Sequence, residues 1–182
     1  MQESIRQTCQ EMLEQRGYVY MEDDTVTKIV EKHGINNFIL RLNQFSLERI
    51  LVFLPILIKF NTDALIKYTT IMKETEINNC IGIYADSVTP KAKEDIKKLS
   101  SSFKVELFSY KELLFNITKH ILQPSFEKVI YENEIEDIKQ KCGQNLPILK
   151  KTDAIVRFYN FSRGDIIKIT RRNGIIIYRQ VK

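Results

Sequence analysis

Residues 49–54 read Arg49-Ile50-Leu51-Val52-Phe53-Leu54, an almost unbroken apolar run. Such a run predicts a strand that is buried on both faces, as in the centre of a sheet. Apolar residues at helical spacing follow over 64–72, then a second apolar strand over 80–84, a helix opened by Thr89-Pro90, and an alternating strand over 103–108. This order of strand, helix, strand, helix and strand predicts an α/β layer.

Two further helices are predicted upstream of this layer. Apolar residues recur at helical spacing over 3–16, and the acidic residues 22–24 suit the start of a second helix that ends at Gly34. Residues 38–42 then have the composition of a strand. The first part of the chain is therefore expected to form a mixed sheet with helices.

A change of character marks the expected domain joint. Residues 116–125 are irregular in pattern, and a charged helix is expected over 132–141. We therefore expect an N-terminal α/β domain over residues 1–112 and a smaller α+β domain over residues 113–182.

The smaller domain is expected to be basic and rich in strands. Asp153 suits the N-cap of a short helix, and strands over 165–171 and 175–181 flank Asn173-Gly174, a strong hairpin signal. The whole chain has a formal charge of +5, and from Lys151 onwards eight Lys or Arg residues stand against two acidic ones. Such a unit binds either nucleic acid or an acidic protein surface, and charge alone leaves both open.

Composition restricts the class of protein. Hydrophobic residues make up 43% of the chain, with only 6 Gly and 4 Pro, so order is expected nearly from end to end. Cys9, Cys80 and Cys142 show no C-x-x-C spacing, which favours buried reduced thiols over a zinc site. The longest apolar run, 50–58, is too short for a bilayer and contains Pro55, and no signal peptide is recognisable. A soluble intracellular protein is expected.

Known catalytic motifs are missing from the sequence. The chain has no phosphate-binding glycine loop and no hydrolase signature, so nucleotide hydrolysis and acyl transfer lack support. Asp86 and Glu106 stand near strand ends, and two such carboxylates could hold magnesium in a nuclease. Against this, Glu106 alternates with Val105 and Leu107 as a solvent-facing strand position. No metal, cofactor or small-molecule substrate is expected.

The arginines of the smaller domain need an explanation. In Arg163-Gly164-Asp165, the glycine suits a tight turn with positive φ ahead of a buried strand over 166–169. A unit this small cannot bury its recurring arginines unpaired, so either a partner protein meets them or they form a solvated basic face. The arginines concerned are Arg157, Arg163, Arg171 and Arg179.

Several motifs in one order resemble a single family. They are Gln15-Arg16-Gly17-Tyr18, Val88-Thr89-Pro90-Lys91-Ala92-Lys93, residues 116–124, Leu146-Pro147-Ile148, residues 163–169 and Tyr178-Arg179. Together they resemble subunit five of the eukaryotic RNA polymerases, a family whose archaeal counterpart keeps only the C-terminal domain. The resemblance covers nearly the whole chain, and the additional N-terminal domain is similar to that of the eukaryotic form.

The resemblance implies a non-catalytic subunit shared by RNA polymerases I, II and III, and therefore a nuclear protein. It implies a C-terminal assembly domain that docks on the largest subunit among the core subunits, and an N-terminal jaw-like domain beside downstream duplex DNA. The residues expected at the subunit interface are Arg157, Arg163, Gly164, Asp165, Lys168, Arg171, Tyr178 and Arg179. Those expected on the DNA side are Pro55, Thr89, Pro90 and Lys91, with Pro55 and Pro90 carried by loops.

The chain departs from the family pattern at three points, one of which is a shortened region between Asp24 and Arg49. The family's Asp-Pro is Asp153-Ala154 here, and its longer loop between the last strands is replaced by Arg172-Asn173-Gly174. Such trimming suggests a compacted eukaryotic genome or a large DNA virus, in which case the protein would be in the host cytoplasm or the virion. A free-standing RNA-binding module of the small-barrel type is the alternative function, because Gly-Asp before an apolar strand also occurs there.

Overall fold

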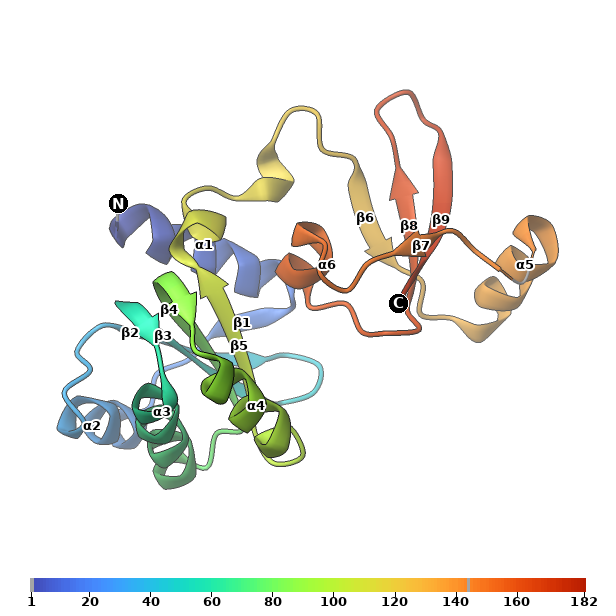
Figure 1. Cartoon of the computed structure of the whole chain (residues 1–182). Helices are drawn as coiled ribbons and strands as arrows, with labels where there is room; N and C mark the ends of the chain where they lie inside the picture. Colours follow the sequence, from blue (N-terminus) through green and yellow to red (C-terminus); the bar gives the residue numbers. More distant parts are fainter. Residues whose placement is uncertain (1, 144) are drawn as a thin grey trace. The chain divides into compact units, whose positions relative to one another are not determined.

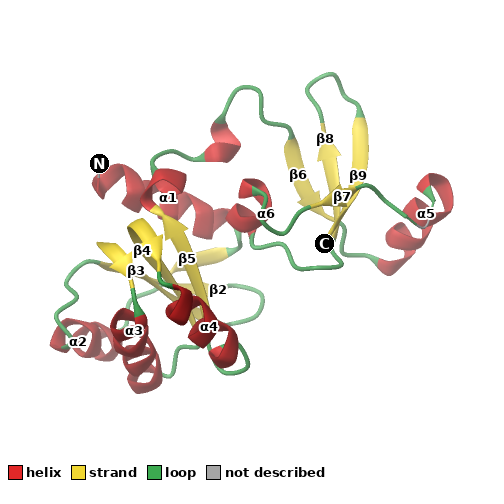
Figure 2. Ribbon diagram, in the orientation of Figure 1, coloured by secondary structure: helices red, strands yellow, loops and turns green. Residues whose placement is uncertain are grey.

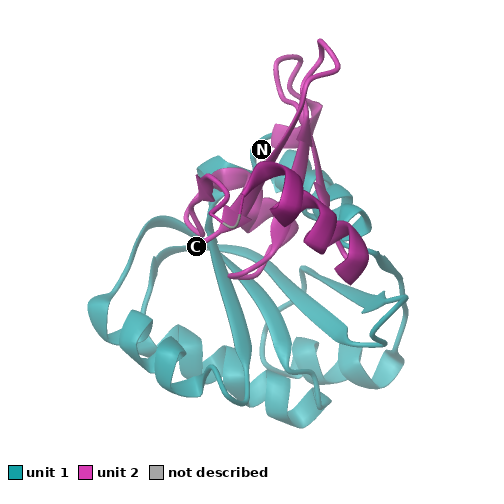
Figure 3. Ribbon diagram, turned by 90° about the vertical axis from the view of Figure 1, so that its right-hand side faces the viewer, with its two compact units in different colours: residues 1–115 teal, residues 116–182 magenta. Residues whose placement is uncertain are grey.

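The computed structural model describes residues 2–143 and 145–182 and divides into two compact units, residues 1–115 and 116–182 (Figure 3). The first unit contains a five-stranded sheet in the order β1-β2-β3-β4-β5. β2 is antiparallel to both of its neighbours, β1 and β3, whereas β3, β4 and β5 are parallel. The strands are β1 (Tyr18–Tyr20), β2 (Phe38–Asn43), β3 (Arg49–Phe60), β4 (Asn79–Val88) and β5 (Lys104–Ser109).

Helices cover both faces of this sheet, as Figure 1 shows. α1 lies on one face, while α2, α3 and α4 lie on the other. The predicted α/β layer with its two upstream helices is thus confirmed. The helices are α1 (Gln2–Gln15), α2 (Asp24–Lys32), α3 (Thr62–Thr75), α4 (Pro90–Leu99) and the 3-10 turn η1 (Tyr110–Leu113).

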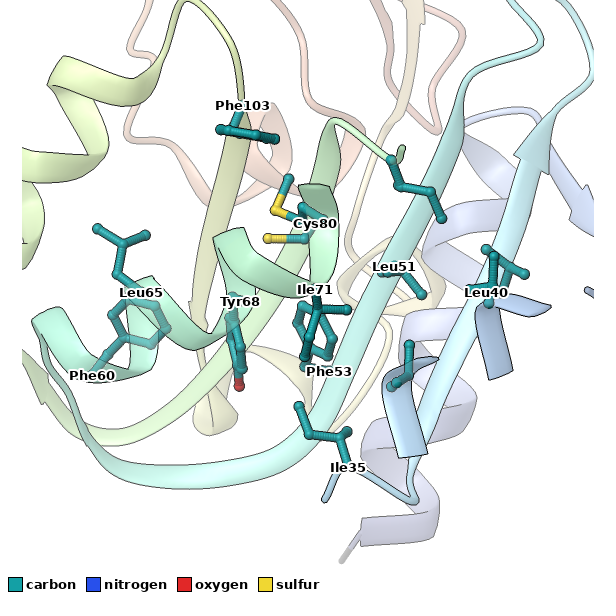
Figure 4. Packing of buried hydrophobic residues seen from close by; sticks show 14 of the residues in the cluster. Ile35, Leu40, Leu51, Phe53, Phe60, Leu65, Tyr68, Ile71, Cys80 and Phe103 are labelled. Atoms are coloured by element: carbon teal, nitrogen blue, oxygen red, sulfur yellow. The ribbon is translucent and has the colours of Figure 1, made fainter. Parts of the chain in front are cut away.

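β3 is the central strand of the sheet, as its apolar run predicts. Leu51 and Phe53 belong to the core beneath α2, α3 and α4 (Figure 4). Ile50 and Val52 are also buried, and alternation along a strand points them to the opposite face, where α1 lies. Both faces of β3 therefore need apolar side chains, which explains the nearly unbroken run.

Pro55 lies inside β3, and the expectation that it sits in a loop is wrong. The last residue of β3 paired with β2 is Phe53, so the strand has a free side from residue 54 onwards, apart from the bond of the Leu54 amide to Asn37. The ladder to β4 also shifts register between Phe53 and Ile56. A proline has no amide hydrogen to donate to a neighbouring strand. It is therefore tolerated at such a bulge, where one edge of the strand has no ladder partner.

Aromatic side chains from β3 and α3 pack closely in the core of the first unit (Figure 4). The ring of Tyr68 stacks on Phe53 with 4.0 Å between centroids and meets Phe60 edge-on at 5.6 Å. The hydroxyl of Tyr68 is buried and has no hydrogen-bond partner among the described residues. Burial accordingly raises the pKa of Tyr68 above its usual range.

We expect Tyr68→Phe to leave the free energy of unfolding unchanged or to raise it by about 1 kcal/mol, because a buried hydroxyl without a partner is costly. Urea unfolding followed by circular dichroism measures the change. Tyr20→Phe is the control, since the hydroxyl of the exposed Tyr20 donates to Glu22 at the surface, and its loss is expected to change the free energy of unfolding by no more than about 0.5 kcal/mol. A clear loss of stability in Tyr68→Phe would contradict the expectation.

The second unit has a four-stranded sheet in the order β6-β8-β9-β7 (Figure 2). It is open, with β6 and β7 at its edges, so the alternative of a small closed barrel is wrong. β6 was not expected, because its residues lie at the end of a stretch with no regular pattern. The elements are η2 (Ile117–Lys119), β6 (Ser125–Lys128), α5 (Glu132–Cys142), β7 (Ile148–Leu149), α6 (Ala154–Tyr159), β8 (Ile166–Thr170) and β9 (Ile176–Val181).

Each helix of the second unit packs on its own face of the sheet. α6 contributes Ile155 to a cluster with Ile167, and α5 contributes Ile138 to a separate cluster with Ile166. Because neighbouring residues of a strand point to opposite faces, these two clusters lie on opposite sides of β8. The predicted α+β class is confirmed.

Local signals in the second unit behave as predicted. The carboxylate of Asp153 accepts the amide of Ile155 at 2.9 Å, so α6 is capped although Ala154 replaces the family's proline. Gly174 has φ +79, and its amide donates to Arg171 at 2.9 Å across the turn between β8 and β9. This is a tight hairpin of the type that needs one left-handed residue after the turn.

The cysteines differ in burial. Cys9 and Cys80 are buried, which raises the pKa of the Cys9 thiol to about 12 and also raises that of Cys80. Cys142 is exposed at the end of α5, so the prediction of a buried thiol is wrong there. Cys142 is on the same helix face as Ile138, but it lies one turn later, beyond the residues of α5 that pack in the cluster.

Candidate functional site

The residues expected at the subunit interface do not form one surface. Arg171 and Arg179 lie on the face of the sheet that α6 partly covers, and both line a cavity there. Lys168 and Tyr178 are paired neighbours on the opposite face, where Tyr178 packs against the α5 cluster. The sheet therefore separates the two pairs.

Arg163, Gly164 and Asp165 form the turn that leads into β8. Gly164 has φ +93, which confirms the predicted left-handed glycine. The carboxylate of Asp165 accepts the amide of Ser162 at 2.7 Å and pairs with Lys128 at 2.9 Å, so it holds the turn together. Arg163 itself is exposed. Within this turn, Arg163 is thus the residue best placed to meet a partner.

The other two predicted cations have different settings. Lys168 lies 3.8 Å from the carboxylate of Glu127 on the neighbouring strand. Arg157 lies half-buried on α6. Neither is as exposed as Arg163 or Arg171.

On the DNA side, Thr89, Pro90 and Lys91 come together at the start of α4. The hydroxyl of Thr89 accepts the amide of Ala92 at 3.3 Å, and Pro90 occupies the first turn as predicted. Pro90 and Lys91 are exposed. This gives a helix start with a positive dipole end and an exposed lysine, both of which favour phosphate.

Pro55 is not part of this group. Its neighbour Ile56 pairs with Ile83 on β4, and Ile83 is five residues before Val88, where that strand ends. At about 3.3 Å per residue, this places Pro55 roughly 16 Å or more from the start of α4. The four residues expected near DNA therefore do not make a compact site.

The nuclease alternative is contradicted by the geometry. Glu106 pairs with Ile81 across β4 and β5, and Asp86 lies five residues further along β4, roughly 16 Å away. Glu106 is also not simply solvent-facing, because both its carboxylate oxygens accept from the guanidinium of Arg16, at 2.9 and 3.0 Å. Asp86 lies near Lys59 at 4.0 Å. The two carboxylates cannot share one metal ion.

No group of three or more His, Cys, Asp or Glu side chains is close enough to hold a metal ion within residues 2–143 and 145–182. In the same part of the chain, no helix has both the length and the apolar composition needed to cross a membrane.

Sequence reasoning missed part of the surface around Arg171. Leu122, Pro124 and Arg172 line the same region as this arginine. Leu122 and Pro124 fall in the stretch without a regular pattern, so only the fold could bring them beside the hairpin. The alternation of β9, which puts Ile177 and Arg179 on one face, was the signal available in the sequence.

Fold and site define a two-unit protein whose exposed cations and apolar hollow suit binding to other macromolecules. The family model of RNA polymerase Rpb5, C-terminal domain, matches residues 115–181. The chain is 31% identical to the Dictyostelium discoideum subunit rpabc1 of DNA-directed RNA polymerases I, II and III, over 92% of this chain and 88% of that protein.

Two other relatives extend the comparison. A protein of Invertebrate iridescent virus 6 that carries the name of a DNA-directed RNA polymerase subunit, 454R, is 31% identical over 97% of each chain. Subunit 5A of RNA polymerase V of Arabidopsis thaliana is 30% identical over 91% of this chain and 79% of that protein. The chain belongs to the RNA polymerase Rpb5 family of non-catalytic subunits of DNA-directed RNA polymerase, and its role is in transcription.

Proposed function

We propose that this protein is the common subunit of RNA polymerases I, II and III, and that residues 116–182 anchor it to the largest subunit. The observation that carries the proposal is the 31% identity to the Dictyostelium discoideum subunit named for all three polymerases, over 92% of this chain. The exposed Arg163 and the cation-lined hollow at Arg171 and Arg179 support an anchoring role for this unit. The location that follows is the nucleus.

Residues 1–115 have a different role in this proposal. The start of α4, with Thr89, Pro90 and Lys91, faces downstream duplex DNA and meets its phosphates without reading sequence. Its support is the exposed lysine beside a capped helix start. Contacts of this kind position the DNA and weaken as salt is raised.

A viral polymerase is the second candidate. The relative from Invertebrate iridescent virus 6 matches 97% of both chains, so the two proteins have nearly the same extent. In that case the partner is a virus-encoded largest subunit, and the location is the host cytoplasm or the virion. The identity of the largest subunit that co-purifies with the tagged chain separates the two candidates.

We expect Arg163→Glu to lower the share of tagged chain recovered with the polymerase by about tenfold or more, because an exposed cation at an anchoring surface becomes repulsive. Affinity purification of the full chain from its own cells measures this. Circular dichroism verifies that the variant is folded. Gly164→Val is a poorer test, since a valine at φ +93 strains the turn itself.

Pro90→Ala is the matched control on the other unit. It keeps the Thr89 cap, so assembly is expected to be unchanged while transcription or duplex binding is altered. Loss of assembly in this variant would reverse the two roles. Absence of the wild-type chain from purified polymerase would end the proposal altogether.

A further inference from the structure

A groove runs across one face of the second unit, between the segment of residues 117–124 and the β8–β9 hairpin. It consists of two cavities of about 340 and 360 Å³ that share Pro124 and Arg171. The floor of the first cavity is apolar. It is lined there by Ile117, Phe126, Leu149, Ile155, Ile169 and Ile177.

The groove exists because α6 is short. A helix of six residues is about 9 Å long, whereas a strand of six residues such as β9 spans about 20 Å. α6 therefore covers only part of the face on which Ile169 and Ile177 lie. The uncovered part remains open to solvent beside Leu122, whose side chain is 75% exposed.

The rim of the groove is positively charged. Arg171, Arg172 and Arg179 line it, and none of them has a carboxylate within salt-bridge distance among the residues that the structure describes. The guanidinium of Arg179 donates to the carbonyl of Ile148 at 3.4 Å. The one acidic side chain at the rim, Asp153, caps the first turn of α6. With three arginines against this one carboxylate, the groove has a net positive charge.

We propose that this groove binds an extended acidic segment of a partner protein, in which carboxylates flank a large aliphatic or aromatic side chain. The apolar side chain fills the cavity above Ile169 and Ile177, and the carboxylates reach the guanidinium groups at the rim. Arginine is suited to this, since it binds carboxylates through two parallel hydrogen bonds. The identity of this partner protein rests on the proposed function, according to which it is the largest polymerase subunit.

Nucleic acid fits the groove less well than such a segment. A phosphate backbone would meet the rim but leave an aliphatic floor uncovered, and base stacking needs aromatic platforms. Phe126 is the one aromatic residue among those that line the two cavities. An aliphatic floor with a cationic rim is typical of a protein-binding site that buries one anchor side chain of the partner and surrounds it with polar contacts.

The test measures binding of the full chain to short overlapping peptides that tile the largest polymerase subunit encoded in the same genome. We expect binding by peptides that combine carboxylates with a large apolar side chain. Changing their Asp and Glu to Asn and Gln is expected to weaken binding about tenfold. The double variant Arg171→Gln with Arg179→Gln, and the exposed-site variant Leu122→Ser, are each expected to weaken it by a similar factor.

Lys141→Gln, an exposed change on α5, which packs on the opposite face of the same sheet, is the matched control and is expected to bind as the wild type does. Three outcomes overturn the inference. They are binding by none of the peptides, binding unaffected by the groove variants, and tight binding of a single-stranded RNA oligonucleotide that the same arginine variants abolish. Each can occur while the chain still co-purifies with polymerase, so failure here is distinct from failure of the proposed function.

Discussion

Gly82→Val is expected to lower the free energy of unfolding of the first unit by about 3 kcal/mol or more, since overpacking a filled core forces side chains and backbone apart. A Cβ atom on Gly82 would lie 2.9 Å from the Tyr68 ring and 3.0 Å from Leu107. The Tyr68 ring cannot yield easily, because it is buried and stacked on Phe53, and the Leu107 side chain of the adjacent strand β5 closes the other side. Valine adds two further methyl groups to this contact.

Urea unfolding followed by far-ultraviolet circular dichroism measures the loss. Ser87→Val is the matched control, because Ser87 is an exposed position of the same strand and a change within about 0.5 kcal/mol is expected there. Shrinking the opposing ring in the double variant Gly82→Ala with Tyr68→Leu is expected to cost less than the sum of the two single changes. Wild-type stability in Gly82→Val would show that the ring moves aside freely.

Element order could be predicted from the sequence because its signals are local. The apolar run at residues 49–54 identified the central strand, Thr89-Pro90 the start of α4, and Asp153 the cap of α6. Each of these depends on a few adjacent residues and on the periodicity of one element. Tertiary contacts did not override any of them.

Features that depend on distant pairing could not be predicted. β3 can continue through Pro55 because its pairing with β2 stops at Phe53, opposite the first residue of β2, and nothing near Pro55 in the sequence indicates where that pairing stops. β6 is a strand because it pairs with β8, although its own pattern is irregular. The groove on the second unit likewise arises where residues 117–124 meet the hairpin.

The predicted interface residues show the same limit. Alternation could have separated Lys168 from Arg171 on the two faces of the sheet, but the role of Asp165 could not be foreseen. Its carboxylate pairs with Lys128, which belongs to the unexpected strand β6. A motif match thus located the turn correctly without distinguishing the residue that builds it from the residue that is exposed.

Arg16→Met is expected to lower the free energy of unfolding by about 2–3 kcal/mol, because it leaves the Glu106 carboxylate, whose side chain is only 25% exposed, without its counter-charge. The side chain of Arg16 is 4% exposed, and its guanidinium donates to both carboxylate oxygens of Glu106. The pair joins Arg16, the residue after α1, to β5, and β5 is the edge strand at the end of the sheet opposite to β1. It thus fixes the N-terminal helix across the sheet face.

The double variant Arg16→Met with Glu106→Leu distinguishes a stranded charge from a packing defect. Replacing both partners by apolar groups is expected to recover most of the loss, since a buried pair and an apolar pair of similar volume differ little in stability. Urea unfolding of the single and double variants measures the coupling.

Lys98→Met breaks the exposed Glu94–Lys98 pair of α4 as a control, and no measurable change is expected there. If the double variant were as unstable as Arg16→Met alone, the methylene stem of Arg16, and not its charge, would be what holds α1 on the sheet.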